Sequence, residues 1–166
     1  MTKDVSSRYA EQLLELYYIS MGTFSSNWDE SNVTVDLPDK WRYSLVMFSD
    51  ELVSAFLLAS VYCANIVHVH QLSVHPKLKG QGYGKKLIRQ LVDISKETGI
   101  EAISLESLVQ NTEANRFYDK LGFEIISDSE SINEYLSNKN KQHKRDEYYP
   151  INNLGIRQVY WMSPLG

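Results

Sequence analysis

The chain alternates between segments with helical spacing of apolar residues and segments rich in β-forming residues. Between Asp4 and Met21 the apolar side chains recur every three or four positions, which predicts a first helix with Asp4 or Ser6 as its N-cap. Residues 22–40 mix Gly, Ser, Asn, Asp and Pro with few apolar residues. They predict a loop that carries a short helix near Trp28.

Strands and helices then follow in a regular order. Trp41–Phe48 and Leu52–Tyr62 are separated only by Ser-Asp-Glu and predict an antiparallel hairpin. After a glycine-rich turn, a helix with an apolar face ends at Gly99, and a second helix begins at Asn111 or Thr112. Further strands are expected at Ile66–Val74, Ile100–Val109, Phe123–Ser127 and Ile156–Ser163. This order predicts an α/β (α+β) fold with a mixed sheet that is parallel where a helix connects two strands.

Length and composition narrow the class of protein. A chain of 166 residues, 43% hydrophobic and 23% charged, predicts a single domain over residues 1–166 with a sizeable core. The formal net charge of −4 leaves no basic field for a long polyanion, so we expect no nucleic-acid partner. The polar segment 128–154 is expected to be an insertion, and is a candidate lid or homodimer contact.

The sequence also predicts the compartment. The N-terminus lacks a basic stretch followed by an apolar one, and the apolar run 52–64 is interrupted by serines and shorter than the ~18 residues of a membrane span. The only cysteine, Cys63, excludes an internal disulfide and a Cys-rich metal site. We therefore expect a cytoplasmic protein with no membrane partner and no metal.

The turn after the third predicted strand carries the first chemical signal. Residues 79–85, KGQGYGK, lie between a strand and a helix, where backbone N–H groups at a helix N-terminus hold a phosphate or pyrophosphate. A Walker A loop is excluded because Lys79 stands where its first glycine is required. A dinucleotide loop is excluded because Lys85 replaces its third glycine.

Two longer motifs account for this turn and for the helix after it. Residues 74–84, VHPKLKGQGYG, match V-x-P-x-x-[RQ]-x-x-G-x-G except at Lys79, and residues 111–123, NTEANRFYDKLGF, match N-x-x-A-x-x-[LF]-Y-x-K-x-G-F. In this order they resemble the GNAT superfamily of N-acetyltransferases. The resemblance covers residues 72–123, while the family's usual first strand is not evident in Met1–Val5.

The resemblance implies a fold and a cosubstrate. The fold would be a GNAT-type mixed, mostly antiparallel sheet with a parallel, splayed central strand pair, flanked by helices, and residues 66–127 would form the cofactor core. Acetyl-CoA would lie with its pantetheine arm in the splay and its pyrophosphate on the glycine loop. Asn111 would bond the cofactor arm, or serve only as the N-cap of its helix. Lys120 would reach the nucleotide end, or be only a solvated charge. The implied cofactor-binding residues are Leu72, Val74, Lys79, Gly80, Gln81, Gly82, Tyr83, Gly84, Lys85, Asn111, Tyr118 and Lys120.

Acetyl transfer to an amine needs a base, because an aliphatic amine with a pKa of ~10.4 is protonated at neutral pH. Strand periodicity places His68 and His70 on one face with Leu72 and Val74. Imidazole titrates near pH ~6.5, so either histidine could accept the proton directly or through water, and His70 is nearer the splay. The strand also resembles that of arylalkylamine N-acetyltransferases; the alternative is two polar residues at a wet sheet edge.

The same resemblance assigns the acid and the acceptor side. Tyr118 occupies the position of the family's general acid for the leaving thiolate, the alternative being a core aromatic residue. An acyl-enzyme on Cys63 is disfavoured because no base is identifiable beside it. Aromatic residues are expected to line the acceptor funnel: Tyr17, Tyr18, Trp28, Trp41, Tyr43, Tyr160 and Trp161. We therefore expect direct acetyl transfer to a primary amine of a small molecule, such as a metabolite, arylalkylamine or antibiotic; the alternatives are a protein or peptide N-acetyltransferase and a non-catalytic acyl-CoA-binding module.

Overall fold

The computed structural model describes residues 1–63, 65–126, 151–152 and 155–164. The N-terminal elements are α1 (Lys3–Arg8), α2 (Ala10–Met21), η1 (Gly22–Phe24), α3 (Glu30–Thr34), α4 (Lys40–Tyr43), β1 (Leu45–Ser49), β2 (Leu52–Cys63) and β3 (Ile66–Val74). They are followed by η2 (Pro76–Leu78), α5 (Tyr83–Glu97), β4 (Ala102–Leu108), α6 (Thr112–Lys120), β5 (Glu124–Ile125), β6 (Ile151–Asn152) and β7 (Gly155–Met162). The predicted insertion 128–154 lies outside the described residues, apart from β6.

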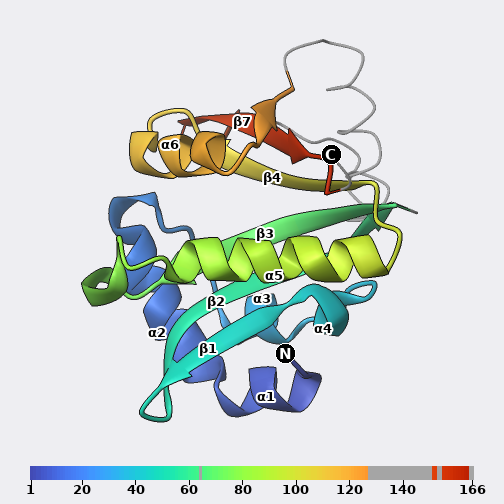
Figure 1. Ribbon diagram of the computed structural model, residues 1–166. Coiled ribbons are helices and arrows are strands. Elements are labelled where there is room, and N and C mark those ends of the chain that lie inside the picture. The colour runs from blue at the N-terminus through green and yellow to red at the C-terminus, as the bar shows by residue number, and fades with distance from the viewer. Residues whose placement is uncertain (64, 127–150, 153–154, 165–166) are drawn as a thin grey trace.

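One mixed sheet organises these elements. Its strands lie in the order β1-β2-β3-β4-β7-β5, and β6 pairs with β7 (Figure 1). Among the strands of the described residues, β3 and β4 alone pair in parallel, and α5 provides the crossover between them. The predicted fold class, a mostly antiparallel mixed sheet with one parallel central pair flanked by helices, is confirmed.

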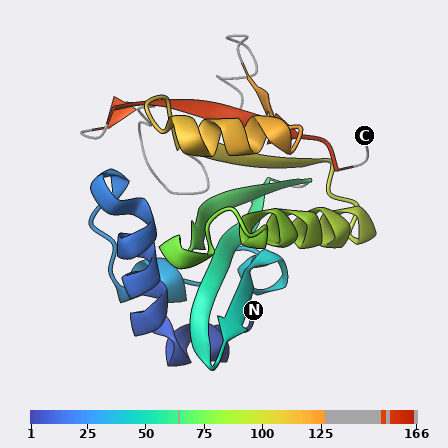
Figure 2. The ribbon, with the colours of Figure 1, turned by 60° about the vertical axis from the view of Figure 1, so that its left-hand side comes forward.

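Helices cover both faces of the sheet because its strands bury side chains on both faces. Along β2, Ala55 and Leu57 pack in the cluster beneath α5, while Phe56 and Leu58 pack in a second cluster with α2 and α3. Figures 1 and 2 show α5 lying across the strands and α2 beside them. None of the helices within the described residues is long and apolar enough to cross a bilayer.

The two central strands separate halfway along their length. Parallel pairing of β3 with β4 begins at Ile66 with Ala102 and ends at Val69 with Leu105. β3 continues to Val74 and β4 to Leu108 without pairing to each other. In Figure 2 the two ribbons lie side by side at one end and diverge toward α2. The expected splay is therefore present.

β3 also carries a bulge at the point where the splay begins. Ala59 of β2 pairs with Val69, but the preceding residue, Leu58, pairs with Gln71. His70 is thus an extra residue on β3 without a pairing partner on β2. A bulge of this kind reverses the side-chain alternation of the strand that follows it.

Two elements differ from the sequence prediction. The first helix is broken at Tyr9, whose φ of −110° and ψ of 18° leave the helical range, and its ring packs against Phe48. Residues 41–43 belong to α4 instead of the first strand, although they are rich in β-formers. Tyr43 is buried in the cluster beneath α5 and its hydroxyl group bonds to Thr98, so tertiary contacts override local propensity here.

Candidate functional site

A continuous cavity of about 920 Å³ passes between β3 and β4 where the strands diverge. It reaches the glycine loop and the start of α6 on one side of the sheet, and α2 and η1 on the other. Most of the site residues expected from the sequence line it: His68, His70, Leu72, Val74, Lys79, Gly80, Gly82, Tyr83, Gly84, Lys85, Asn111 and Tyr118. Gln81 and Lys120 do not line it; Gln81 donates its amide N–H to the Lys77 carbonyl, and Lys120 is exposed at the end of α6.

The bulge at His70 divides the side chains of β3 between the two ends of this cavity. Val67 and Val69, before the bulge, and Leu72 and Val74, after it, all pack against the cluster beneath α5. The expectation that Leu72 and Val74 share a face with the two histidines is therefore wrong. Simple alternation over the whole strand produced that expectation, and the extra residue at His70 breaks the alternation.

The two histidines lie on the opposite face, toward α2. His68 pairs in register with Ser60 of β2, and the Ser60 Oγ lies 2.7 Å from Nε2 of His70. His68 is 4% exposed, and its Nδ1 lies 3.0 Å from Oγ of Ser104 on β4. The two imidazoles meet edge to face with centroids 5.1 Å apart. Of these two histidines, His70 is the one that is partly exposed, so it is more accessible from the cavity than His68.

The strand edge inside the splay offers backbone hydrogen-bonding groups. His75 N donates to Ser54 O at 2.9 Å, so His75 and Ser54 form a hydrogen-bonded pair of the β2–β3 ladder. In an antiparallel ladder such pairs alternate, so the N–H and C=O groups of Leu72 and Val74 point away from β2. They face the side where β4 has diverged. This edge can pair with an extended ligand, as a third strand would.

The glycine loop ends at the N-terminus of α5. Gly80 and Gly82 have φ of 76° and 85°, in the left-handed region that favours glycine, and Gly82 is the N-cap of α5. At Gly84 a Cβ atom would lie 3.1 Å from Cζ of Phe117 on α6, so glycine allows the close approach of the two helices. The exposed N–H groups and the dipole of this 15-residue helix favour an anion at the loop.

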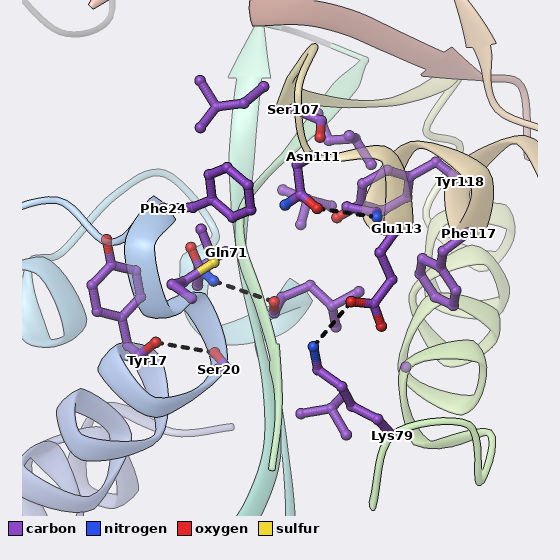
Figure 3. Close-up of a pocket in the computed structure, with 18 of the residues that line it drawn as sticks. Tyr17, Ser20, Phe24, Gln71, Lys79, Ser107, Asn111, Glu113, Phe117 and Tyr118 are labelled. Atoms are coloured by element: carbon purple, nitrogen blue, oxygen red, sulfur yellow. Dashed lines mark hydrogen bonds and ion pairs between the residues drawn. The ribbon is translucent and has the colours of Figure 1, made fainter. Parts of the chain in front are cut away.

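An ion pair joins the two sides of the cavity above this loop. Nζ of Lys79 lies 3.2 Å from a carboxylate oxygen of Glu113 on α6, and both residues line the cavity (Figure 3). Asn111 begins α6, and its Oδ1 accepts a hydrogen bond from Ala114 N at 3.3 Å. Asn111 is thus an N-cap, and it also lines the cavity. Its capping role leaves the amide N–H group for a ligand.

Glu106 is a charged cavity residue of β4 that the sequence reasoning missed. It lies on β4 two positions after Ser104, which bonds to His68, so its side chain projects to the same face as the histidines. Glu106 follows Leu105, the last residue of β4 that pairs with β3, so it lies where the splay opens and lines the same cavity as His70. The signal in the sequence was an isolated carboxylate within an otherwise apolar or small-residue strand, residues 102–108.

Tyr118 lies on α6, on the side of the sheet that carries α5. It is half-buried, its ring contacts those of Phe117 and Phe123 with centroids 5.3 and 5.7 Å away, and it lines the cavity. Tyr118 is therefore both part of the aromatic packing of α6 and accessible from the cavity. The phenol and the histidines approach the splay from opposite faces.

The wall opposite β3 is held in place by two tyrosines of α2. Tyr17 stacks on Trp28 with centroids 4.3 Å apart, and its hydroxyl group accepts a hydrogen bond from Ser26 N at 2.7 Å. Tyr18 uses its hydroxyl group to bond both N and O of Trp28. Of the aromatic residues expected here, Tyr17 and Trp28 line the cavity, whereas Tyr18, Trp41 and Tyr43 do not. The side chains of residues 160 and 161 lie outside the described set.

A parallel strand pair that splays above a glycine loop and a helix N-terminus defines a GNAT-type acetyltransferase fold. The chain belongs to the Acetyltransferase (GNAT) family, whose sequence profile matches residues 13–123. The two motifs and the splay are thus features of the family to which this chain belongs.

The chain is also similar to individual proteins, in sequence over part of its length and in fold over most of it. A ribosomal protein bS18-alanine N-acetyltransferase from Haemophilus ducreyi is 32% identical over 74 residues, which cover 43% of this chain and 51% of that relative. The chain therefore spans about half the length of this relative. The crystal structure of Ard1 from Thermoplasma volcanium has a TM-score of 0.68 at 21% identity and covers 93% of this chain and 92% of its own. PaiA N-acetyltransferase from Thermoplasma acidophilum, solved with coenzyme A, has a TM-score of 0.63 at 18% identity and covers 95% and 94%.

Proposed function

We propose that the protein transfers the acetyl group of acetyl-CoA to the primary amine of a small molecule. The observation that carries this proposal is the continuous cavity that passes through the splay. One end of it reaches the glycine loop and Tyr118, and the other reaches His70 and Glu106. Groups able to hold an acyl donor and groups able to accept a proton thus meet across one opening.

The residues of the first end fit coenzyme A. The N–H and C=O groups of Leu72 and Val74 suit the amide groups of a pantetheine arm, and the loop with the α5 N-terminus suits a pyrophosphate. Lys79 and Lys85 line the cavity beside the loop and add positive charge. PaiA from Thermoplasma acidophilum, which shares the fold, was solved with coenzyme A. Acetyl-CoA supplies the acetyl group as an activated thioester.

The residues of the second end fit proton removal from an amine. His70 is held by Ser60 and opens to the cavity, while His68 is buried behind it and bonded to Ser104. Glu106 lies on the neighbouring strand just past the last residue that pairs with β3, and it lines the same cavity. We assign the base to His70, with His68 as its buried neighbour, and Glu106 as an anion that attracts the ammonium form of the acceptor.

We assign to Tyr118, which lines the cavity from the other face, the role of protonating or hydrogen-bonding the leaving thiolate. A phenol is a suitable acid for this step, because a thiolate whose conjugate acid has a pKa of ~8.5 needs only a weak acid nearby. The aromatic side chains around Tyr118 limit the access of water. Base and acid then act from opposite faces of the sheet, so they do not neutralise each other.

The acceptor end favours an amine with an apolar part. Phe24, Trp28, Ile19 and Met21 line this end of the cavity, and the tyrosine contacts fix the segment that carries Trp28. Apolar walls with few polar groups are typical of sites for small ligands. An aromatic ring can also hold an ammonium group over its face.

A protein N-terminus is the second candidate acceptor. It is favoured by the Haemophilus ducreyi relative, which is named for the alanine of ribosomal protein bS18. A peptide presents a primary amine, as a small molecule does. It differs in that the rest of its backbone must extend out of the cavity along the sheet. The two candidates therefore predict different dependence of turnover on the length of the acceptor.

The test is thiol release from acetyl-CoA by the purified protein with arylalkylamines, polyamines, aminoglycosides, amino acid amides and short peptides. The proposal predicts turnover with a small amine and no gain from extending it into a peptide. Turnover that requires a peptide would favour the second candidate. Binding of acetyl-CoA without turnover of any acceptor would contradict both and favour a binding module.

A further inference from the structure

Gln71 follows the bulge of β3, and its side chain is turned toward α2 and into the acceptor end of the cavity. Its partner in the ladder, Leu58, packs in the cluster with α2, and paired residues share a face. Gln71 is half-buried and lines the cavity. Without the bulge, strand alternation would place this side chain beneath α5. The bulge at His70 therefore brings the amide of Gln71 to the acceptor end.

The amide of Gln71 is held in one orientation. Its Nε2 donates to Leu72 O at 3.2 Å and to Ser73 Oγ at 3.0 Å. The labelled Gln71 side chain in Figure 3 lies between α2 and the strand. Ser73 is 1% exposed, and its hydroxyl group lies 2.9 Å from that of Ser20 on α2. Ser20 in turn donates to Tyr17 O at 3.0 Å. This chain of contacts uses the two N–H groups of the amide and ties its orientation to α2.

The group left for a ligand is the amide oxygen. Within the described residues, no hydrogen bond reaches Oε1 of Gln71. A half-buried acceptor without a partner is stabilised by a ligand N–H or O–H group and disfavours a ligand without one. Since the amide oxygen carries no net charge, it does not select for a charged donor. An uncharged donor such as an amide N–H group suits it.

We propose that Gln71 is a specificity-determining residue, whose Oε1 accepts a hydrogen bond from a second N–H group of the acceptor. This inference rests on the proposed function. The reacting amine lies at the opening of the splay, beside His70 and Glu106, and Gln71 is the next residue along β3, ~3.3 Å further from that point. The donor it reads is thus a neighbour of the reacting amine, as in an amino acid amide.

The experiment compares two acceptors that differ in one group. Phenylalanine N-methylamide carries an N–H where phenylalanine methyl ester carries an oxygen, and both carry the same primary amine. We expect the wild-type protein to favour the amide in kcat/KM by about five- to tenfold, the range of one hydrogen bond. Gln71→Met should reduce this preference to near unity, mainly through the KM of the amide. Calorimetric titration of the amide into the CoA-bound protein should show the same loss of affinity.

Two further variants complete the test. Gln90→Met changes an exposed glutamine on α5 outside the cavity and should keep the full preference. Ser73→Ala removes one of the two contacts that orient the amide, and should reduce the preference in part. An amide preference that persists in Gln71→Met, or wild-type turnover of other amines but of neither probe, would overturn the inference and leave the proposed function standing. Absence of turnover with every amine would overturn the proposed function and this inference with it.

Discussion

Ser60 on β2 holds the imidazole of His70 through a contact of 2.7 Å between Oγ and Nε2, at the residue where β3 bulges. Ser60 is fully buried, so this contact is not exchanged with bulk water. The bulge and the contact together direct His70 toward α2 while the backbone of the following residues borders the splay. One irregularity in a strand thereby separates the acceptor face from the acyl-donor face.

This geometry predicts that His70 controls the acidic limb of the pH profile. Protonation of the imidazole removes its ability to accept a proton, so kcat/KM of the wild-type protein should fall on the acidic side of the pH optimum. His70→Ala should lower kcat/KM by about 100-fold and abolish the limb. The measurement is the pH dependence of thiol release under acceptor-limited conditions.

Glu106 provides the control for this assignment. Glu106→Gln removes a negative charge from the cavity that His70 lines and should raise the KM of a cationic acceptor several-fold, while the acidic limb remains. If Glu106→Gln abolishes the limb and His70→Ala keeps it, the base is Glu106. If only the double variant of His68 and His70 loses the limb, the proton passes through both histidines and water.

Tyr118→Phe should lower kcat by about 100-fold and leave the Kd of CoA nearly unchanged, because the variant loses a proton donor and keeps the ring. Stopped turnover assays and calorimetry separate the two quantities. Tyr43→Phe is the matched control, since it removes a buried hydroxyl group bonded to Thr98 outside the cavity. An unchanged kcat in Tyr118→Phe would remove this residue from the acid role.

The Lys79–Glu113 ion pair should compete with the phosphates of CoA for the same ammonium group. Glu113→Gln frees Lys79 and should tighten CoA binding by about two- to fivefold at low salt, with a smaller gain at high salt, because exposed ion pairs are weak and screened. Lys79→Gln should weaken binding. Glu97→Gln, on an exposed position of α5 outside the cavity, is the control. Weaker binding in Glu113→Gln would show that Glu113 helps to hold the ligand.

Lys40 makes the folding free energy depend on pH. Its ammonium group is buried and donates to Val33 O and Val35 O, and this burial lowers the pKa of Lys40 to about 8, against the raising effect of Asp36. Between pH 8 and the unfolded pKa of ~10.4, the unfolded chain binds a proton that the folded chain has lost. The free energy of unfolding should therefore rise with pH in this window.

Urea unfolding of the wild-type protein and of Lys40→Met tests this dependence. The difference between them should increase by about 2 kcal/mol in favour of the wild type from pH 8 to pH 10. Groups that titrate in both proteins cancel in the difference. A flat difference would mean that the buried lysine keeps its ordinary pKa in the folded protein.

The sequence predicted the parts of this molecule that local patterns control. The bounds of β3 agree residue for residue with the apolar run Ile66–Val74, and Gly99 and Gly122 close their helices with positive φ. The two motifs located the loop and α6, because their chemistry depends on residues close together in the chain. Most of the cavity lining on the acyl-donor side follows from these motifs.

Features that depend on distant contacts escaped the sequence. The helical spacing of apolar residues continues through Tyr9, so the sequence does not reveal that the helix breaks there. In the structure the break at Tyr9 coincides with packing of its ring against Phe48. The sequence of residues 68–74, HVHQLSV, is compatible with a regular strand and with a bulged one. The bulge becomes evident only from the pairing of β3 with β2. Glu106 could not be identified as a site residue from the sequence, because only the divergence of β3 and β4 opens the cavity that it lines.

The central claim is that the edge of β3 inside the splay binds the arm of acetyl-CoA. It is tested most directly by amide hydrogen exchange at Leu72, Ser73 and Val74, measured by NMR with and without saturating acetyl-CoA. The account predicts slower exchange at Leu72 and Val74, whose N–H groups face the splay, and little change at Ser73, whose N–H faces β2. Unchanged exchange at Leu72 and Val74 in the saturated complex would contradict it.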